Sequence, residues 1–386
     1  MSPVKPSSIA MILSAGAAQS SSQYNHRSSK KDLIKNMTLP TVQFKSQCGY
    51  SGFPTSHVQF LRCKSDKGEL QIAAVSSELP GFIRDGLLRC CSCGREYPII
   101  DGIVHMLENQ ELDAEGAHEL RLRDKTIEKR PDAYEYLLGE LRNNLEMKAT
   151  LAALNLYGGC ALLELACGPG RYTTTFVGKC KALVAVDFSL ESLFALARKI
   201  HPGSQVGLVL ADITRLTVAP RSFDRVLSTT SLDSREQRMV MNRLVADALT
   251  DKGRFVFSTE FYDLRSRLLG LPRARRYTPG GIYYCHLEKD EIIQETAPFF
   301  RRVRVRPINV VVPFSSRLGY MAQLVISQVA EQIPLLRNFG ELLLVSAINA
   351  IRPPEEGKYL AGNKLFKTIY HWYWDRRKPE IEGDKN

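Results

Sequence analysis

The sequence contains no run of eighteen apolar residues, which is about the shortest stretch that forms a helix across a bilayer. We therefore expect no transmembrane segment. The nine cysteines are scattered and odd in number, a pattern that argues against a disulfide framework and for a reducing compartment. From these two absences we expect an intracellular, cytoplasmic protein.

The first 47 residues contain a single acidic side chain, Asp32, and carry a net charge of +5. They are rich in serine and show no hydrophobic periodicity, so we expect a disordered or transit-like leader. A transit segment would direct the chain to a plastid or a mitochondrion. Because the leader holds much of the total charge of +11, the rest of the chain is mildly basic, which is compatible with RNA as a partner but does not require it.

An apolar stretch at residues 161–165 runs into a glycine turn at residues 166–170. Such a stretch is too short for a buried helix, so it predicts a parallel strand followed by a tight loop and a helix. Gly168 and Gly170 tolerate positive φ angles and let the backbone pass close to a ligand. Loops of this kind cradle nucleotides.

Three further apolar stretches end in polar residues, namely Asp187, Asp212 and Ser228. Asp187 lies nineteen positions after Gly168, where a doubly wound sheet places a carboxylate that accepts hydrogen bonds from ribose hydroxyls. Four strand ends in register predict an α/β fold with a nucleotide-containing cofactor at the carboxyl edge of the sheet.

Over residues 150–350 the chain resembles the class I S-adenosylmethionine-dependent methyltransferases, in a type 11-like form, because Glu164-x-Ala-x-Gly-x-Gly170 replaces the dinucleotide pattern. The resemblance implies a seven-stranded Rossmann-like sheet and S-adenosyl-L-methionine as cofactor. It places Glu164 near the methionine amino group, Asp187 on the ribose and Asp212 on the adenine amine. The full implied cofactor set is Glu164, Ala166, Gly168, Gly170, Asp187, Asp212 and Ser228.

Residues 48–110 resemble the zinc-ribbon-like domain of the small activator subunit of tRNA and protein methyltransferases, through a Cys-x-x-Cys pair and the ending at residues 97–103. In the first half of the pattern, Asp66 follows Cys63 at the position where a second cysteine is usual. A structural zinc wants four ligands, so either Cys63, Asp66, Cys90 and Cys93 hold zinc, or apolar residues alone hold the ribbon. In both cases we expect a docking or substrate-presenting module.

Residues 111–150 are expected to form a linker and a cofactor-covering helix, because apolar residues, with Tyr134 and Tyr136 near them, recur at helical spacing over 134–154. Arg302, Arg304 and Arg306 alternate with valines, as on the exposed side of an antiparallel strand. The other expected elements are helices over 234–249 and 317–332, the second capping the pocket, and strands over 253–259, 309–313 and 341–347, the last antiparallel.

The insertion after the fifth expected strand is placed like the substrate lid of small-molecule methyltransferases. His286 within it is the candidate base, and Tyr283, Tyr284 and Asp233 are candidate substrate contacts. A structural histidine is the alternative. Methyl transfer relies mostly on orientation and desolvation, and a base is needed only for hydroxyl or amine acceptors.

Residues 230–234 lack the Asn/Asp-Pro-Pro-Tyr/Phe pattern of base amino-group methylases, which argues against adenine N6 chemistry. We expect methyl transfer to a small-molecule or lipid-like acceptor on oxygen, nitrogen or carbon. The alternatives are an RNA methyltransferase and a non-catalytic scaffold. Residues 351–386 hold both tryptophans before a basic cluster, so this extension is either a peripheral membrane contact or a docked helix.

Overall fold

The computed structural model describes residues 49–108, 112–130, 140–232, 234–276, 280–310 and 319–352. Asp233, Tyr134 and Tyr136, the expected leader and the chain beyond residue 352 lie outside the described residues.

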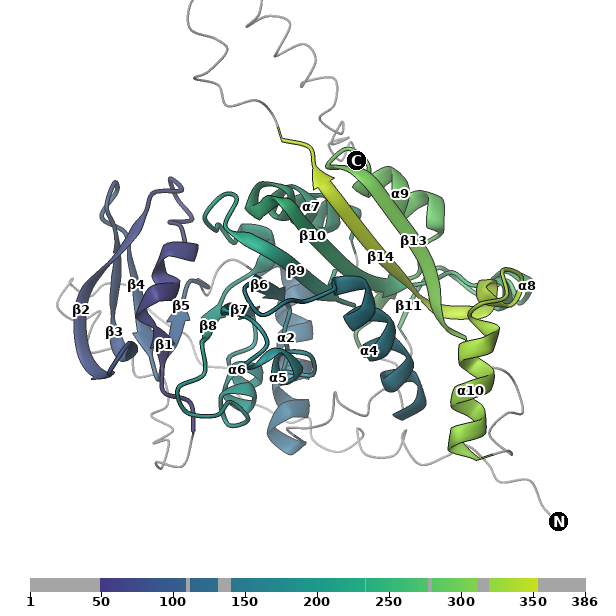
Figure 1. Ribbon diagram of the computed structural model, residues 1–386, viewed down its shortest axis with the longest axis horizontal. Helices are drawn as coiled ribbons and strands as arrows, with labels where there is room; N and C mark the ends of the chain where they lie inside the picture. Colours follow the sequence, from purple (N-terminus) through teal and green to yellow (C-terminus); the bar gives the residue numbers. More distant parts are fainter. Residues whose placement is uncertain are drawn as a thin grey trace, which may run out of the picture. The chain divides into compact units, whose positions relative to one another are not determined.

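Seven strands form the Rossmann-like sheet that the sequence predicts (Figure 1). They are β6 (Ala161–Leu165), β7 (Ala182–Asp187), β8 (Val206–Leu210), β9 (Phe223–Thr229), β10 (Leu249–Glu260), β13 (Phe300–Val310) and β14 (Gly340–Ala350). Their order is β8-β7-β6-β9-β10-β14-β13. β14 runs antiparallel to both of its neighbours, as predicted, and β6 to β10 are mutually parallel. The carboxyl ends of the parallel strands β6 to β10 therefore meet at one edge of the sheet.

The sixth strand was predicted over residues 309–313, but β13 spans Phe300–Val310 and thus begins earlier. The prediction followed the densest apolar residues. The structure follows the alternation of Arg302, Arg304 and Arg306 with valines, because β13 is an edge strand with one polar face.

The sheet has twelve strands rather than seven, because the N-terminal module (residues 49–108) adds five more. These are β1 (Phe53–Pro54), β2 (Leu70–Leu79), β3 (Phe82–Cys90), β4 (Glu96–Ile100) and β5 (Ile103–His105), with a 3₁₀ helix η1 (Thr55–Phe60) after β1. β5 pairs in parallel with β8, so that Ile103 opposes Leu208. At this junction a Cβ on Gly207 would lie 2.7 Å from the Phe53 ring. The N-terminal module and the seven strands therefore form one continuous hydrogen-bonded sheet.

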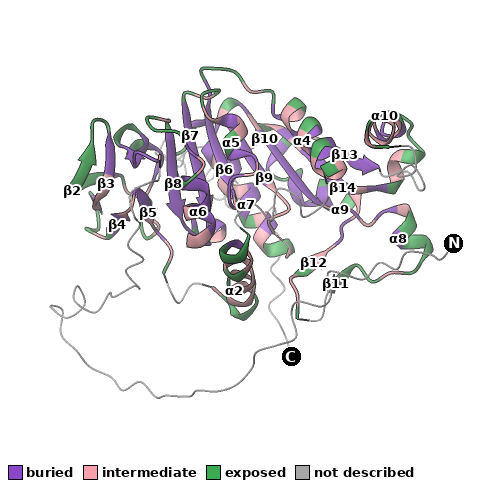
Figure 2. Cartoon of the chain, turned by 90° about the horizontal axis from the view of Figure 1, so that it is seen from below, coloured by how far each residue is buried: buried purple, intermediate pink, exposed green. Residues whose placement is uncertain are grey.

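Helices cover both faces of the seven-stranded part, and Figure 2 shows that most of these strands are coloured as buried. Buried residues of the helices pack against the strands in two clusters. One face packs on α4 (Glu140–Leu154), α5 (Thr173–Phe176) and α6 (Leu190–Ala197), and the other on α7 (Arg235–Ala248) and α9 (Lys289–Thr296). The remaining described elements are α2 (Ala114–Lys129), η2 (Ile213–Arg215), α8 (Leu264–Leu268), α10 (Tyr320–Ala330), η4 (Leu336–Phe339) and a hairpin of β11 (Ala274–Arg276) and β12 (Tyr283–Cys285).

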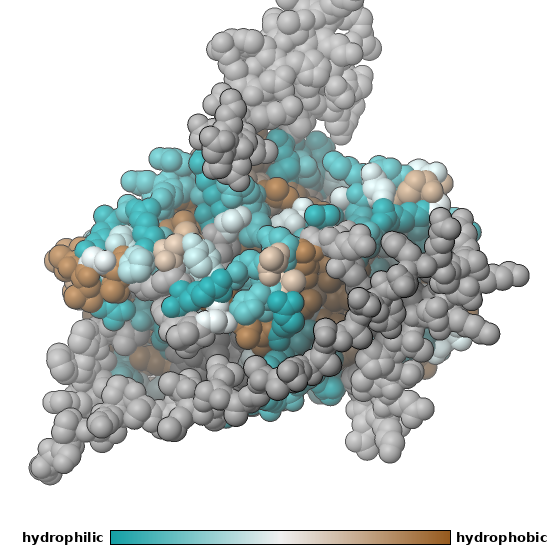
Figure 3. All heavy atoms as spheres, turned by 180° about the vertical axis from the view of Figure 1, so that it is seen from behind, coloured by the Kyte–Doolittle hydropathy of each residue, from teal (hydrophilic) through white to brown (hydrophobic). Residues whose placement is uncertain are grey.

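The apolar helix α10 packs on α4 and β13, and none of its described residues lines the cavity at the carboxyl edge, so the expected capping is not observed. Many exposed apolar side chains lie on α10, η4 and α8, including Leu268, Leu269 and Met321. Figure 3 shows apolar residues gathered at the end where α8 lies. None of the described helices combines the length and apolar character needed to cross a membrane.

Candidate functional site

The loop after β6 has an unusual backbone that brings it close to the carboxyl edge. Ala166, Gly168 and Gly170 have φ angles of 54°, 53° and 90°. At Gly170 an added Cβ would lie 2.3 Å from Leu196 of α6. The loop therefore requires glycine at this position, both for its conformation and for its contact with α6.

Two buried carboxyl groups lie beside this loop. Glu164 in β6 accepts a hydrogen bond from Thr173 Oγ1 at 2.7 Å, and burial raises its pKa to about 8. Asp187 at the end of β7 accepts from the backbone N–H groups of Gly168 at 2.7 Å and Ser189 at 2.9 Å, and burial raises its pKa as well. Asp187 thus fixes the glycine loop against the start of α6.

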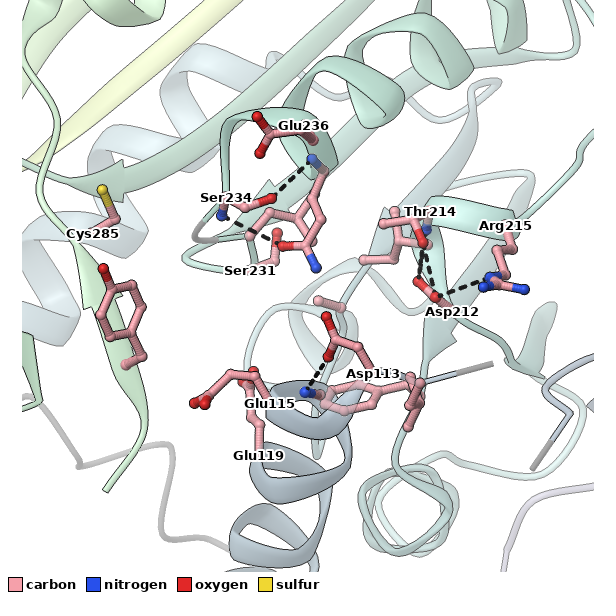
Figure 4. Close-up of a pocket in the computed structure, with 18 of the residues that line it drawn as sticks. Asp113, Glu115, Glu119, Asp212, Thr214, Arg215, Ser231, Ser234, Glu236 and Cys285 are labelled. Carbon is pink, nitrogen blue, oxygen red and sulfur yellow. Dashed lines mark hydrogen bonds and ion pairs between the residues drawn. The ribbon is translucent and has the colours of Figure 1, made fainter. Parts of the chain in front are cut away.

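A cavity of about 560 Å³ opens beside the loop at the ends of β6, β8 and β9 (Figure 4). This volume is ordinary for a small-molecule site. Ala166, Phe188, Asp212 and Ser231 line its sheet side. The other walls come from the first turns of α2 and α7 and from two hairpin residues, Tyr283 and Cys285.

The cavity is acidic. Five of its lining residues are carboxylates (Asp113, Glu115, Glu119, Asp212 and Glu236), against the two cations Arg215 and Arg235. Figure 4 shows three of these carboxylates on α2 and its N-cap, with Asp212 and Glu236 on other elements around the same hollow. A cationic ligand is therefore favoured over an anionic one.

Helix α2 forms a wall of the cavity that the sequence analysis missed. Ser189 Oγ donates to Asp124 at 2.6 Å, which fastens α2 beside Asp187. Glu115 pairs with Arg276 of the hairpin at 2.7 Å. The sequence feature that could have predicted the start of this helix is its N-cap, Asp113, followed by an acidic residue in the first turn. In the structure Asp113 Oδ1 accepts a hydrogen bond from the Gly116 N–H at 2.7 Å.

The structure brings the expected cofactor residues together around one cavity. Ala166 and Asp212 line it directly. The Ser228 hydroxyl is buried 2.6 Å from Ser231 Oγ, which lines it. Asp212 is held by Thr214, whose N–H and hydroxyl both donate to it at 2.8 Å. Of the other expected residues, Gly168 and Gly170 lie in the glycine loop, and Glu164 and Asp187 lie in β6 and at the end of β7 beside it.

The expected catalytic residues are placed differently. Tyr283 and Cys285 line the cavity, and strand alternation turns Tyr284 between them to the opposite face. His286 is 3% exposed and does not line the cavity. Its Nδ1 lies 3.0 Å from the carbonyl oxygen of Arg273 across the hairpin.

All four expected metal ligands converge in the N-terminal module. The ligand atoms of Cys63, Asp66, Cys90 and Cys93 lie within 4.8 Å of one another. They sit on two tight turns, in which Lys67 N–H donates to Cys63 O and Gly94 N–H donates to Cys90 O. A hydrogen bond from the Gly68 N–H lowers the pKa of Asp66 to about 2. Three thiols and an ionised carboxylate suit tetrahedral zinc.

Residues 162–253 match the family described as "Methyltransferase domain". An S-adenosylmethionine-dependent methyltransferase from Mesorhizobium loti is 21% identical, with 52% of this chain and 95% of that chain covered and a TM-score of 0.38. The N-methyltransferase NodS from Bradyrhizobium japonicum WM9 in complex with S-adenosyl-L-homocysteine is 16% identical, with coverages of 55% and 88% and a TM-score of 0.38.

A complex of the Haloferax volcanii Trm112 methyltransferase activator with a methyltransferase is also similar. It shows 16% identity, coverages of 62% of this chain and 98% of that chain, and a TM-score of 0.39. No curated protein matches the chain at a significant level.

Proposed function

We propose that this chain, whose residues 162–253 match a methyltransferase-domain family, transfers the methyl group of S-adenosylmethionine to a small-molecule or lipid-like acceptor. The observation that carries the proposal is the acidic cavity beside the glycine loop, with Asp212 in its wall and Asp187 beneath the loop. S-adenosylmethionine supplies an electrophilic methyl group on a positively charged sulfur, so its charge suits this cavity.

In this proposal each carboxyl group has a separate role. Asp187 accepts from the ribose hydroxyls while it holds the Gly168 N–H. Asp212 accepts from the adenine amine. Glu164, whose pKa is about 8, ionises when it meets the ammonium group of the methionine part, because a nearby cation favours the charged form.

The acceptor side is formed by the first turn of α7 and the hairpin. Ser234 caps α7 by accepting from the Gln237 N–H, which fixes Glu236 at the rim of the cavity. Glu236 is the exposed carboxylate there that can hold a cationic acceptor or take a proton. Tyr283 and Cys285 form the facing wall. We give His286 a positioning role, since it braces the hairpin through Arg273.

The N-terminal module holds a structural zinc ion in this proposal, bound by the cluster of three cysteines and Asp66. Four protein ligands leave no open position for a substrate, so the metal serves folding and not catalysis. Its effect is to order the turn before β2 and the turn between β3 and β4. From there the chain leads through β4 and β5 to the methyltransferase sheet.

Calorimetric titration with S-adenosylmethionine tests the proposal. We expect binding by the natural chain and at least about tenfold weaker binding by Asp187→Asn, because at least one acceptor for the ribose is lost. The matched control is Asp251→Asn, which removes an exposed carboxylate paired with Arg352 and should leave binding unchanged. Absence of binding by the natural chain would support a non-catalytic scaffold instead.

A further inference from the structure

A second hollow, of about 660 Å³, lies at the far edge of the sheet, between α4 and the strands β10, β13 and β14. It shares no lining residue with the acidic cavity. Five arginines line it, namely Arg254, Arg301, Arg302, Arg304 and Arg306. We call it the arginine groove.

The positions of four of the five arginines follow from strand register, since Arg301 directly precedes Arg302 on β13 and falls outside the alternation. Arg302, Arg304 and Arg306 occupy alternate positions of β13 and therefore project from one face. Alternate residues on a strand are about 6.8 Å apart, so the three form a row along the open edge. Arg254 of β10 joins this face, because Arg254 and Arg302 both oppose Ile348 of β14.

The charge of the groove is uncompensated within the described residues. No ion pair there involves any of the five arginines, and Arg254 donates only to the Ala153 carbonyl. Burial, together with the charges of Arg225 and Arg304, lowers the pKa of Arg254. Burial raises the pKa of Glu331 and the charge of Arg306 opposes that rise, but the Glu331 carboxylate accepts a hydrogen bond from the Asn309 N–H.

Protection of an edge strand against pairing with another chain explains cations on β13. It does not explain Arg254, which comes from an inner strand, nor the hollow above it. That hollow exists because α4 presents the small side chains Ala149, Ala152 and Ala153 over the arginines. The groove thus combines a row of cations with space for a ligand.

We propose that the arginine groove binds the phosphodiester backbone of single-stranded nucleic acid. Guanidinium groups form paired hydrogen bonds with phosphate oxygens, and a row of cations along an open edge suits a linear polyanion. Among the described residues, no aromatic side chain lines the groove, so the expected contacts go to the phosphates and not to the bases. Contacts to phosphates carry no sequence information, so binding should be independent of sequence.

A membrane surface fits this groove less well. A bilayer contact would combine cations with exposed apolar side chains. The exposed apolar residues of α8 and α10, such as Leu268 and Met321, do not line the groove. The inference does not depend on the proposed catalytic function, since the residues of the two hollows are different.

The test is fluorescence anisotropy with a labelled twelve-nucleotide uridine oligonucleotide and the full chain, at 50 to 200 mM salt. Contacts to about four phosphates predict a slope of log K against log salt near −3, which is about a 60-fold loss of affinity over this range. In the double variant Arg302→Gln/Arg304→Gln we expect the slope to become shallower by about 1.4 and affinity at 50 mM salt to fall at least about tenfold.

The matched control is Arg89→Gln/Arg267→Gln, which removes the same charge from two exposed arginines that pair with Glu96 and Glu288. It should retain most of the affinity. The melting temperature of each variant verifies folding. Equal losses in both double variants, or no binding by the natural chain, would overturn the inference. Binding to anionic phospholipid vesicles that depends on Arg302 and Arg304, without oligonucleotide binding, would also overturn it.

Discussion

Glu164 links the cofactor site to the pH dependence of stability. Its pKa is 4.5 in an unstructured chain and about 8 in the fold because of burial. Between these values the folded state keeps a proton that the unfolded state releases. The contribution to stability is therefore fully present below about pH 4.5 and is lost as pH rises through about 8.

We predict that the melting temperature of the cofactor-free protein falls less between pH 5.5 and 8.5 in Glu164→Gln than in the natural chain, because glutamine cannot ionise. The free energy involved is at most about 5 kcal/mol. Thermal melts at both pH values, with the natural chain beside the variant, provide the measurement. An equally steep loss in the variant would assign the pH dependence to other groups, such as Asp187, whose pKa is also raised by burial.

His286 offers a second test at a single residue. In its observed place it braces the hairpin and does not face the cavity, so His286→Gln should cost about 1 kcal/mol of stability and leave the pH profile of methyl transfer unchanged. A general base would instead contribute about 10²- to 10⁴-fold in rate. A rate loss of that size with an unchanged melting temperature would restore the catalytic role.

The residues expected to hold the cofactor lie closer to the cavity than His286 and Tyr284, which were expected to act on the acceptor. Glycine at positive φ and carboxylates at strand ends have few other uses, so Gly170, Asp187 and Asp212 were found from their spacing. His286 and Tyr284 were chosen by chemistry alone. The register of the hairpin decides which side chains of β12 face the cavity. No pattern in the sequence predicted that register.

Among the elements, α2 controls one wall of the cavity. Its attachment is the hydrogen bond from Ser189 to the half-buried Asp124. We predict that Asp124→Ala weakens S-adenosylmethionine binding about fivefold or more, because loss of this bond releases the helix at a cost near 1 kcal/mol. Glu128→Gln, an exposed change on the same helix, is the control. Indistinguishable affinities in calorimetry would show that α2 does not support the site.

The turns of the N-terminal module provide an element-scale test of zinc. We expect the purified chain to hold one zinc ion per molecule by elemental analysis, and Cys90→Ser to lose the ion and lower the melting temperature. Asp66→Cys should retain zinc against a stronger chelator, because thiolate is the more usual ligand. A folded natural chain with no zinc after metal supplementation would mean that the module is held by apolar packing alone.

Elements with local signals were predictable from the sequence. Buried strands such as β7 show as apolar runs, and α7 shows its capping box at Ser234. Helix α2 is polar on most of its surface, so periodicity did not reveal it. The alternation of Arg302, Arg304 and Arg306 with valines did indicate a strand, but the sixth strand was placed over the apolar run at residues 309–313, whereas both segments overlap one strand, β13.

For the whole molecule, the central feature is one continuous sheet. The family resemblance implied a seven-stranded sheet with its last strand antiparallel, and a small N-terminal module beside it. It did not predict that β5 would pair with β8, since pairing between segments about 100 residues apart leaves no local pattern. The close fit of Phe53 on Gly207 is the packing that makes this junction possible.

The most direct test of the account is methyl transfer itself. The chain is incubated with radiolabelled S-adenosylmethionine and a cell extract that is then separated into organic-soluble, RNA and protein fractions. We predict label in small molecules or the organic fraction, and loss of that label with Asp187→Asn but not with Asp251→Asn. Label confined to RNA or protein, or no transfer despite cofactor binding, would contradict the account.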